Sequence, residues 1–392
     1  MRRLSVLDWI AIGLFLLGLV FLATGLLPVG QAQATVARIA PILVFLGAVI
    51  VLAELTAEAG VFDVIAVRLT ILAGGSFGAL FVLCVLFAAI TTATLNLDTT
   101  AVLLTPVMLA VARKLAIPGM PLAMTTVWLA NTASLLLPVS NLTNLLAMNR
   151  VALSAPEFAA RMALPELASV AATAGCLWLF YWRRKRRGMD RYEPPAPARP
   201  RDRVLFGVCS AACVVFVGGV VTGVPLEIVS PVCAAVVALV FLLRSRSSLR
   251  WGLLPWRLLV FVTGLFLVVQ TISDHGLAGI VHAVIGSDPG GPGVFRAAGA
   301  GAGLSNLLNN LPAYAAGEAV VPLANHEQLL GLLIGTNVGP IVVPWASLAT
   351  LLWYERCQSA GVSVNWRRFL GTGAVTALAC LVAATGVLVL QA

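Results

Sequence analysis

The chain has 392 residues, of which 60% are hydrophobic and only 10% are charged, and its mean hydropathy is +0.99. Soluble domains carry roughly 25% charged residues, so this composition excludes a water-soluble globular protein and indicates a polytopic, all-α membrane protein. The net charge of +9 would suggest nucleic-acid binding in a soluble protein. Here nine Lys and Arg lie within residues 183–203. We therefore interpret that stretch as a linker whose charge reports topology, and we expect no nucleic-acid partner.

Apolar runs predict seven helices in chain order, near 7–27, 38–53, 164–182, 204–222, 225–243, 254–272 and 369–390, since a transmembrane helix needs about 20 apolar residues. The start of the chain resembles a signal peptide, but it is too long for one and lacks a convincing cleavage site, so we expect a retained first helix. Glu54, Glu58, Asp63 and Arg68 predict a segment that lies in the membrane interface.

Four further segments are apolar but interrupted by polar residues. Residues 76–113 and 292–324 predict re-entrant hairpins, with tips at Asn96-Leu97-Asp98-Thr99-Thr100 and Asn309-Asn310-Leu311-Pro312. Residues 121–148 and 327–353 predict broken transmembrane helices. Unwound backbone at membrane depth is tolerated only where it is buried in protein or lines a cavity, so we expect the four breaks to converge near the midplane.

The two halves of the sequence match each other weakly. Residues 131–146 align with 337–352 without a gap, with the Asn, the central Pro and three Leu identical; further matches occur at offsets of 213 and 216. This pattern predicts two inverted-topology repeats, at 1–182 with the N-terminal helix and at 204–392, joined by the cytoplasmic linker 183–203. Broken helices at matching places in two halves indicate the substrate site of a secondary transporter.

The basic residues agree with this arrangement. When the N-terminus and the linker are placed inside, 21 of the 25 Lys and Arg fall on the cytoplasmic side. Only Arg38, Arg150, Arg161 and Arg296 fall outside or near the outer side, in agreement with the positive-inside rule. The sequence therefore predicts a multi-pass protein of the bacterial inner (plasma) membrane with a cytoplasmic N-terminus and linker.

Polar side chains of the four breaks are the candidate substrate ligands, because they offer donors and acceptors without a net charge. They are Asn96, Thr99, Thr100, Asn131, Thr132, Ser134, Ser140, Asn141, Thr143, Asn144, Asn306, Asn309, Asn310, Thr336, Asn337, Ser347 and Thr350. Such residues also hold helices together, and for Thr91, Thr92 and Thr125 we favour that structural role.

Asp98 is the candidate proton-coupling residue, since this topology places it as the only acid deep in the bilayer, where burial favours the neutral carboxyl. Cys209 and Cys213 share a helix face and could hold a soft metalloid, but we interpret them as small buried apolar residues.

We expect no metal site and no cofactor. An intramembrane serine protease needs Ser beside a deep His, and a metalloprotease needs His-Glu-x-x-His. Neither is present, so we expect no enzyme. A channel stays an alternative, although inverted broken helices favour alternating access.

Several motifs resemble those of the bacterial arsenite and antimonite efflux permeases, a branch of an ion-transporter superfamily that includes dicarboxylate and citrate carriers. They lie at 98–106, 131–144, 304–312 and 339–353, and the resemblance covers roughly 38–390. It implies an elevator-like or rocking antiporter that exports As(OH)3 or Sb(OH)3 against an inward proton flow. The arsenite pattern has acids where this chain has Asn131 and Asn337, so coupling rests on Asp98 alone or the substrate differs.

The alternative within the superfamily is a sodium- or proton-coupled carrier of dicarboxylates or similar anions. As(OH)3 is neutral at pH 7 and suits hydroxyls and amides, whereas a dicarboxylate needs two positive loci. No Lys or Arg occurs in the hairpin tips or broken segments, although half-helix dipoles could substitute. The expected partners are a small inorganic or organic solute, protons or sodium as coupling ion, the lipid bilayer and a second copy in a homodimer.

Overall fold

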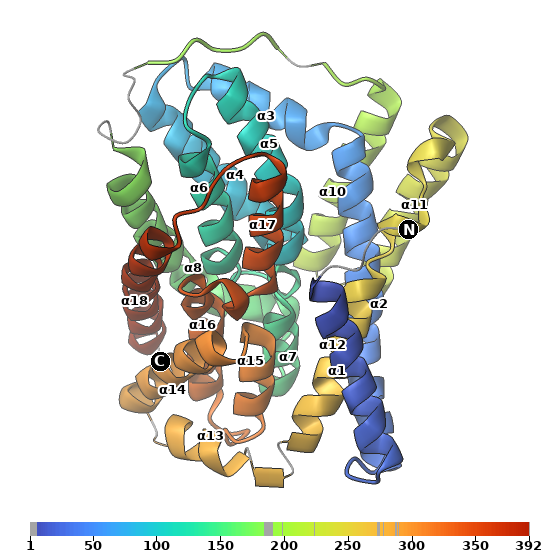
Figure 1. The fold of residues 1–392 in the computed structure, drawn as a ribbon, viewed down its shortest axis with the longest axis vertical. Helices are drawn as coiled ribbons and strands as arrows, with labels where there is room; N and C mark the ends of the chain where they lie inside the picture. Colours follow the sequence, from blue (N-terminus) through green and yellow to red (C-terminus); the bar gives the residue numbers. More distant parts are fainter. Residues whose placement is uncertain are drawn as a thin grey trace.

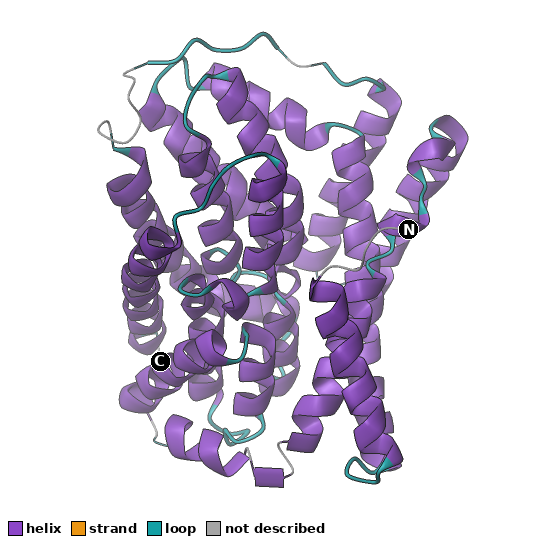
Figure 2. Ribbon diagram, in the orientation of Figure 1, coloured by secondary structure: helices purple, strands orange, loops and turns teal. Residues whose placement is uncertain are grey.

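The computed structural model describes residues 6–183, 191–197, 199–222, 224–272, 275–276, 278–286, 288 and 290–391. Figures 1 and 2 show a bundle of helices, and within these residues the β structure is limited to an isolated bridge between Ser76 and Arg191. Seven of the described helices are long and apolar enough to cross a membrane. The predicted all-α polytopic fold is confirmed.

One of these potential spans is Phe77–Leu95, and the N-terminal helix is not among them. Helices lie at all seven places that the hydropathy pattern predicted, although the second begins nine residues before its predicted start. They are α1 (Val6–Ala23), α2 (Val29–Glu58), α8 (Ala155–Leu177), α10 (Arg203–Val221), α11 (Leu226–Arg244), α12 (Trp256–Ile272) and α18 (Trp366–Leu390), and α8 continues as a π-helix at Trp178–Trp182. The short helix α3 (Val61–Leu72) follows a left-handed Gly60. It lies across the upper end of the bundle in Figure 1, the orientation expected of an interfacial segment.

Helix α8 begins at residue 155, nine residues before the predicted start. The Ser154 Oγ accepts a hydrogen bond from the Glu157 N–H, and the Glu157 carboxylate accepts one from the Ser154 N–H. This capping box satisfies two backbone donors that a helix start leaves unpaired. The longer helix places Glu166 at its middle instead of near its end.

Both predicted hairpins are present as pairs of packed helices. The first consists of α4 (Phe77–Leu95) and α5 (Leu97–Lys114), joined at Asn96, and the second of α14 (Gly290–Leu307) and α15 (Asn310–Glu318). Figure 1 shows α4 and α5 both extending to the upper end of the molecule. By length and composition α4 could cross a membrane, but the chain reverses at Asn96.

The two broken helices have the same internal order. In the first, α6 (Gly119–Thr132) is followed by a 3-10 turn at Pro138–Ser140 and by α7 (Leu142–Val151). In the second, α16 (His326–Val338) leads through 3-10 turns at Gly339–Ile341 and Pro344–Ala346 to α17 (Leu348–Ser359). Pro138 and Pro344 each open a 3-10 turn, a first position that suits proline because its fixed φ is already helical and its missing N–H would have no partner there.

The helices form two groups, which we call the scaffold and the core. The scaffold consists of α1, α2, α10, α11 and α12, which pack on one another at the right of Figure 1. The core contains both hairpins, both broken helices, α8 and α18. The remaining short helices are at Arg246–Ser248, Trp251–Leu253 and Ala278–Ile285 (α13).

The described part of the linker is anchored to the core. Tyr192 is buried against the turn between α3 and α4, where its hydroxyl donates to the Thr70 carbonyl and its N–H to the Gly75 carbonyl. Downstream, Asp202 caps α10 and pairs with Arg244 at 2.8 Å; that hydrogen bond holds the pKa of Asp202 below its usual range.

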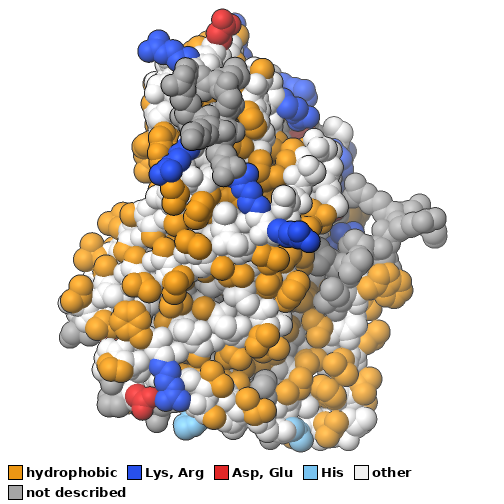
Figure 3. Space-filling view, turned by 60° about the vertical axis from the view of Figure 1, so that its left-hand side comes forward, with side chains coloured by type: hydrophobic (Ala, Val, Ile, Leu, Met, Phe, Trp, Pro, Cys, Tyr) orange, Lys and Arg blue, Asp and Glu red, His pale blue; other side chains and the backbone are white. Residues whose placement is uncertain are grey.

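The face of the molecule drawn in Figure 3 carries most of its Lys and Arg in the upper half, above a largely apolar surface.

Candidate functional site

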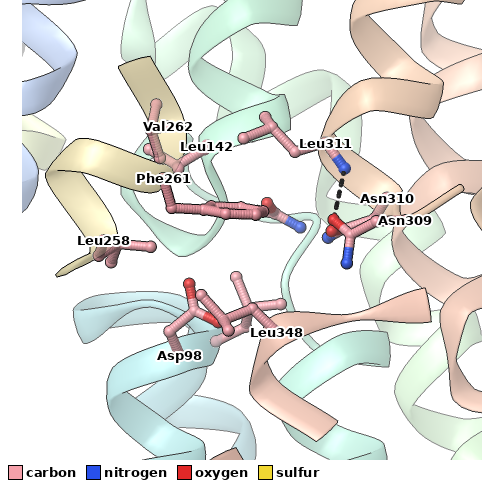
Figure 4. Close-up of a pocket in the computed structure, with 11 residues that line it drawn as sticks. Asp98, Leu142, Leu258, Phe261, Val262, Asn309, Asn310, Leu311 and Leu348 are labelled. Carbon is pink, nitrogen blue, oxygen red and sulfur yellow. Dashed lines mark hydrogen bonds between the residues drawn. The ribbon is translucent and has the colours of Figure 1, made fainter. Parts of the chain in front are cut away.

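Four helix N-termini meet at one small cavity between the core and the scaffold. Leu97, Leu142, Asn310 and Leu348 are the first residues of α5, α7, α15 and α17, and all four line a cavity of about 20 Å³. Thus each of the four predicted breaks contributes a helix start to the same place (Figure 4). A helix N-terminus presents free N–H groups and partial positive charge, so the cavity attracts electron-rich oxygen atoms.

Side chains at the N-cap positions complete three of these helix starts. Asn96 Oδ1 accepts from the Thr99 N–H at 2.9 Å, Asn141 Oδ1 from the Thr143 N–H at 3.2 Å, and Asn309 Oδ1 from the Leu311 N–H at 3.3 Å. At α17 the N-cap is Ser347, whose hydroxyl makes no such bond. The tip residues Asn96 (φ 103°, ψ 164°) and Asn309 (φ 139°, ψ 158°) occupy backbone conformations that essentially only glycine adopts without strain.

Several buried polar atoms around the cavity have no hydrogen-bond partner in the described chain. Asp98 Oδ1 and Asn141 Nδ2, both on cavity-lining residues, are unpaired. The hydroxyls of Thr99, Ser347 and Thr350, on the same helix starts, are unpaired as well. Most buried polar groups in folded proteins are paired, so this concentration indicates a place for a polar ligand.

The scaffold supplies an apolar wall opposite Asp98. Leu258, Phe261 and Val262 of α12 line the cavity, and Figure 4 shows the Phe261 ring reaching between Asp98 and Leu142 towards Asn309. A cavity of about 20 Å³ holds about one water molecule. A solute therefore requires α12 and the hairpin tips to separate.

Beneath the cavity, one amide joins the two broken helices. Asn337 Nδ2 donates to Asn144 Oδ1 at 2.8 Å and Asn337 Oδ1 accepts from the Thr143 hydroxyl at 2.6 Å. Asn144 Nδ2 in turn donates to the carbonyls of Ser134 and Leu137, which lie in the unwound segment before α7. Asn144 therefore holds the first unwound segment, and Asn337 from the other half of the sequence bonds to Asn144 and also donates to the Ser134 carbonyl at 3.4 Å.

The structure separates the candidate residues into two sets. Asp98, Asn141, Asn309 and Asn310 line the cavity. Asn96, Thr143, Asn144 and Asn337 make the bonds described above, and the hydroxyls of Thr99, Ser347 and Thr350 are unpaired. The remaining candidates donate to backbone carbonyls: Thr100 to Asn96, Asn131 to Val127, Thr132 to Trp128, Ser134 to Asn131, Ser140 to Ala93, Asn306 to Ala302 and Gly339, and Thr336 to Leu333.

The sequence predicted Asp98 as the only acid deep in the bilayer, but Asp98 is not the only acid buried in the protein. Glu166 and Glu318 are also buried. Glu318 ends α15 and pairs with Arg38 of α2 at 3.1 Å. Glu166 lies at the middle of α8 because that helix starts at its capping box, a signal that the Ser154-x-x-Glu157 pattern already carries in the sequence. By contrast, Cys209 and Cys213 pack against α2, and neither lines the cavity.

The chain is a multi-pass membrane transporter and not an enzyme, as its family and its named relatives indicate. Residues 4–353 match the family described as "Citrate transporter" (CitMHS), and the chain belongs to that family. It is 29% identical over 367 residues to an arsenical pump membrane protein of Yersinia enterocolitica, a match that covers 88% of this chain and 85% of the relative.

Two further comparisons agree with this assignment. An arsenical pump membrane protein of Escherichia coli is also 29% identical over 367 residues, with the same coverage. The predicted resemblance to the arsenite-efflux permeases of the ion-transporter superfamily is thereby confirmed. The crystal structure of the Alcanivorax borkumensis YdaH transporter has a similar fold, with a TM-score of 0.56 at 14% identity over 98% of this chain and 97% of that chain.

Proposed function

We propose that this protein exports arsenite and antimonite across the bacterial plasma membrane in exchange for protons. The observation that carries the proposal is a cavity at four helix N-termini whose lining, within the described residues, includes Asp98 and three Asn side chains but no Lys or Arg. As(OH)3 is neutral and carries hydroxyls that both donate and accept hydrogen bonds. It matches the unpaired Asp98 and Asn141 atoms without needing a countercharge.

Asp98 is the proposed site of proton exchange. It is the second residue of α5, its Oδ1 is unpaired, and none of the ion pairs among the described residues includes it. The helix N-terminus favours the carboxylate, whereas burial at membrane depth favours the neutral acid. A group with these opposed influences can release its proton to the cytoplasm and accept one from outside as the core moves against the scaffold.

We further propose that the halves 1–182 and 204–392 are inverted repeats around a cytoplasmic linker. The hairpin tips Asn96 and Asn309 share an unusual backbone conformation, and the broken helices place Pro138 with Pro344 and Leu142 with Leu348 at equivalent steps. Equivalent breaks in two halves are what alternating access around a fixed site requires.

The rival is a sodium- or proton-coupled carrier of dicarboxylates or similar anions. Its support is the same set of helix N-termini, whose partial positive charge can hold carboxylates without a basic side chain. The description of the matched family as a citrate transporter favours it too. A tricarboxylate requires far more widening of a 20 Å³ cavity than As(OH)3 does.

Expression in bacterial cells that lack their own arsenite pump tests the proposal. We expect growth in arsenite and antimonite, and arsenite uptake into everted vesicles that stops when the pH gradient is collapsed. The matched control is Asp98→Asn at equal membrane abundance, which should give neither. Sodium-stimulated succinate or citrate uptake without protection against arsenite would refute the proposal and establish the rival.

A further inference from the structure

Glu166 is a buried acid that the proposed mechanism does not use. Its side chain projects from the middle of α8, and the residue is 6% exposed. Its Oε2 accepts a hydrogen bond of 2.9 Å from the Leu135 N–H. Leu135 lies in the unwound stretch between α6 and α7, so its N–H has no place in a helical ladder and depends on this side chain.

The hydrogen bond connects Glu166 to the residues that shape the cavity. Ser134, the neighbour of Leu135, presents its carbonyl to Asn144 Nδ2 at 2.7 Å and to Asn337 Nδ2 at 3.4 Å. Asn144 belongs to α7, whose N-cap Asn141 lines the cavity. A change at Glu166 therefore reaches the cavity through the unwound segment and the start of α7.

Among the residues that the structure describes, Glu166 has no fixed countercharge. None of the ion pairs among the described residues includes it, and α6 and the Pro138–Ser140 turn carry no titratable side chain. The titratable groups on the other elements packed against α8 are Cys380, Arg367 and Arg368 of α18, Tyr181 of the π-helix, and Arg203, Cys209 and Cys213 of α10. On α8 itself, Arg161 pairs with Glu327 and Glu157 caps the helix.

An unpaired carboxylate at membrane depth is unfavourable, and protonation removes its charge. A protonated carboxyl keeps an oxygen that accepts from Leu135 and gains an O–H donor. The unwound segment around it offers backbone carbonyls as acceptors. Proton binding at Glu166 thus changes both the charge and the hydrogen bonding at the break between α6 and α7.

We propose that Glu166 is a second proton-binding site, which joins proton binding to the position of the α6–α7 break. It supplements Asp98, so the transporter holds one carboxyl at the cavity and one behind the first broken helix. The role of Glu166 in coupling rests on the proposed proton-driven function. The proposal that Glu166 binds a proton does not depend on that function.

Infrared difference spectroscopy of the purified protein in lipid nanodiscs tests the proposal directly. A buried protonated carboxyl gives a C=O stretching band apart from the amide bands, and the band disappears when the proton is lost. We expect two such pH-dependent bands in the wild type. Glu166→Gln should lose one, and Asp98→Asn should lose the other. The exposed Glu157→Gln, on the same helix, should retain both.

The Glu166→Gln variant keeps an oxygen that can accept from Leu135, so it should fold. If it does not, Glu166→Asp keeps a titrating group and should shift the band instead of removing it. Unchanged bands in Glu166→Gln, or an unshifted band in Glu166→Asp where only that variant folds, would overturn the proposal. A band lost in Glu166→Gln supports it, even in a protein that gives no arsenite resistance; that result would count against the proposed function alone.

Discussion

At Asn337 a single amide acts as both donor and acceptor between the two broken helices. Its Nδ2 donates to Asn144 Oδ1 and its Oδ1 accepts from the Thr143 hydroxyl. A carboxylate at this position would offer only acceptors and would face the Asn144 oxygen. This explains why an amide suits position 337 here, where the arsenite pattern leads us to expect an acid.

Replacement of Asn337 by Ala should therefore destabilise the protein more than the matched replacement of Asn131. Asn337→Ala leaves Asn144 Oδ1 and the Thr143 hydroxyl without these partners, at roughly 1–3 kcal/mol for each buried group. Asn131 Nδ2 bonds only to Val127 of its own helix, and its Oδ1 is unpaired, so Asn131→Ala should cost about 1 kcal/mol. Thermal unfolding of the purified variants in detergent measures the difference. Equal losses would contradict the bridging role of Asn337.

Asp98→Asn should abolish proton-driven transport while leaving substrate binding intact. The amide keeps the shape of the side chain and an accepting oxygen, but it cannot bind and release a proton as a carboxyl group does. Arsenite binding to purified protein, measured by calorimetry beside vesicle uptake, separates the two effects. If the variant shows wild-type uptake under a pH gradient, Asp98 has no part in coupling.

At the level of single residues, the sequence identified the polar positions better than their roles. All the predicted candidates lie at or near the four breaks, because Asn, Ser and Thr inside apolar runs are visible in the sequence. Which of them face the cavity could not be predicted, since Asn141 and Asn144 are one helical turn apart and only the packing decides between them. The hydropathy pattern predicts a helix start at 164 and so does not show that Glu166 lies at mid-helix, because hydropathy does not register a capping box.

At the scale of elements, the two hairpin tips hold their asparagines in a strained conformation. Asn96 and Asn309 have positive φ with extended ψ, which costs about 1–3 kcal/mol for a residue other than glycine. Strain that recurs at equivalent tips, beside unpaired polar atoms, is typical of a functional site. Sequence patterns predicted where the tips lie but not this conformation, because Asn-rich turns adopt several backbone geometries.

Substitutions at the tips should separate strain from capping. Asn96→Gly and Asn309→Gly should raise thermal stability, since relief of about 1–3 kcal/mol exceeds the few tenths lost when glycine replaces an N-cap asparagine. Asn96→Ala and Asn309→Ala keep the strain and lose about 1 kcal/mol of capping. These two variants should therefore be less thermally stable than the wild type. Melting temperatures of the four variants decide this. Ala and Gly variants of equal stability would show that the tip conformation stores no strain.

At the scale of the whole molecule, the cavity joins two bodies that are also held together by an ion pair. Phe261 of the scaffold lies against the cavity on one side, and Arg38 of the scaffold pairs with Glu318 of the core at 3.1 Å. Movement of the core past α12 must break both contacts. The hydropathy pattern predicted the long helices and the breaks, but not the division into scaffold and core, because contacts between distant segments leave no local periodicity.

The orientation of this assembly in the membrane is testable with two cysteines on a cysteine-free background. Glu193 is exposed in the linker at the upper end of Figure 1, and Gln31 is exposed near the turn between α1 and α2 at the opposite end. Because basic residues favour the cytoplasmic side, Glu193→Cys should react with an impermeant thiol reagent only after the cells are opened. Gln31→Cys should react in intact cells. Labelling of Glu193→Cys from outside would overturn the cytoplasmic linker, and with it the direction assigned to proton-driven export.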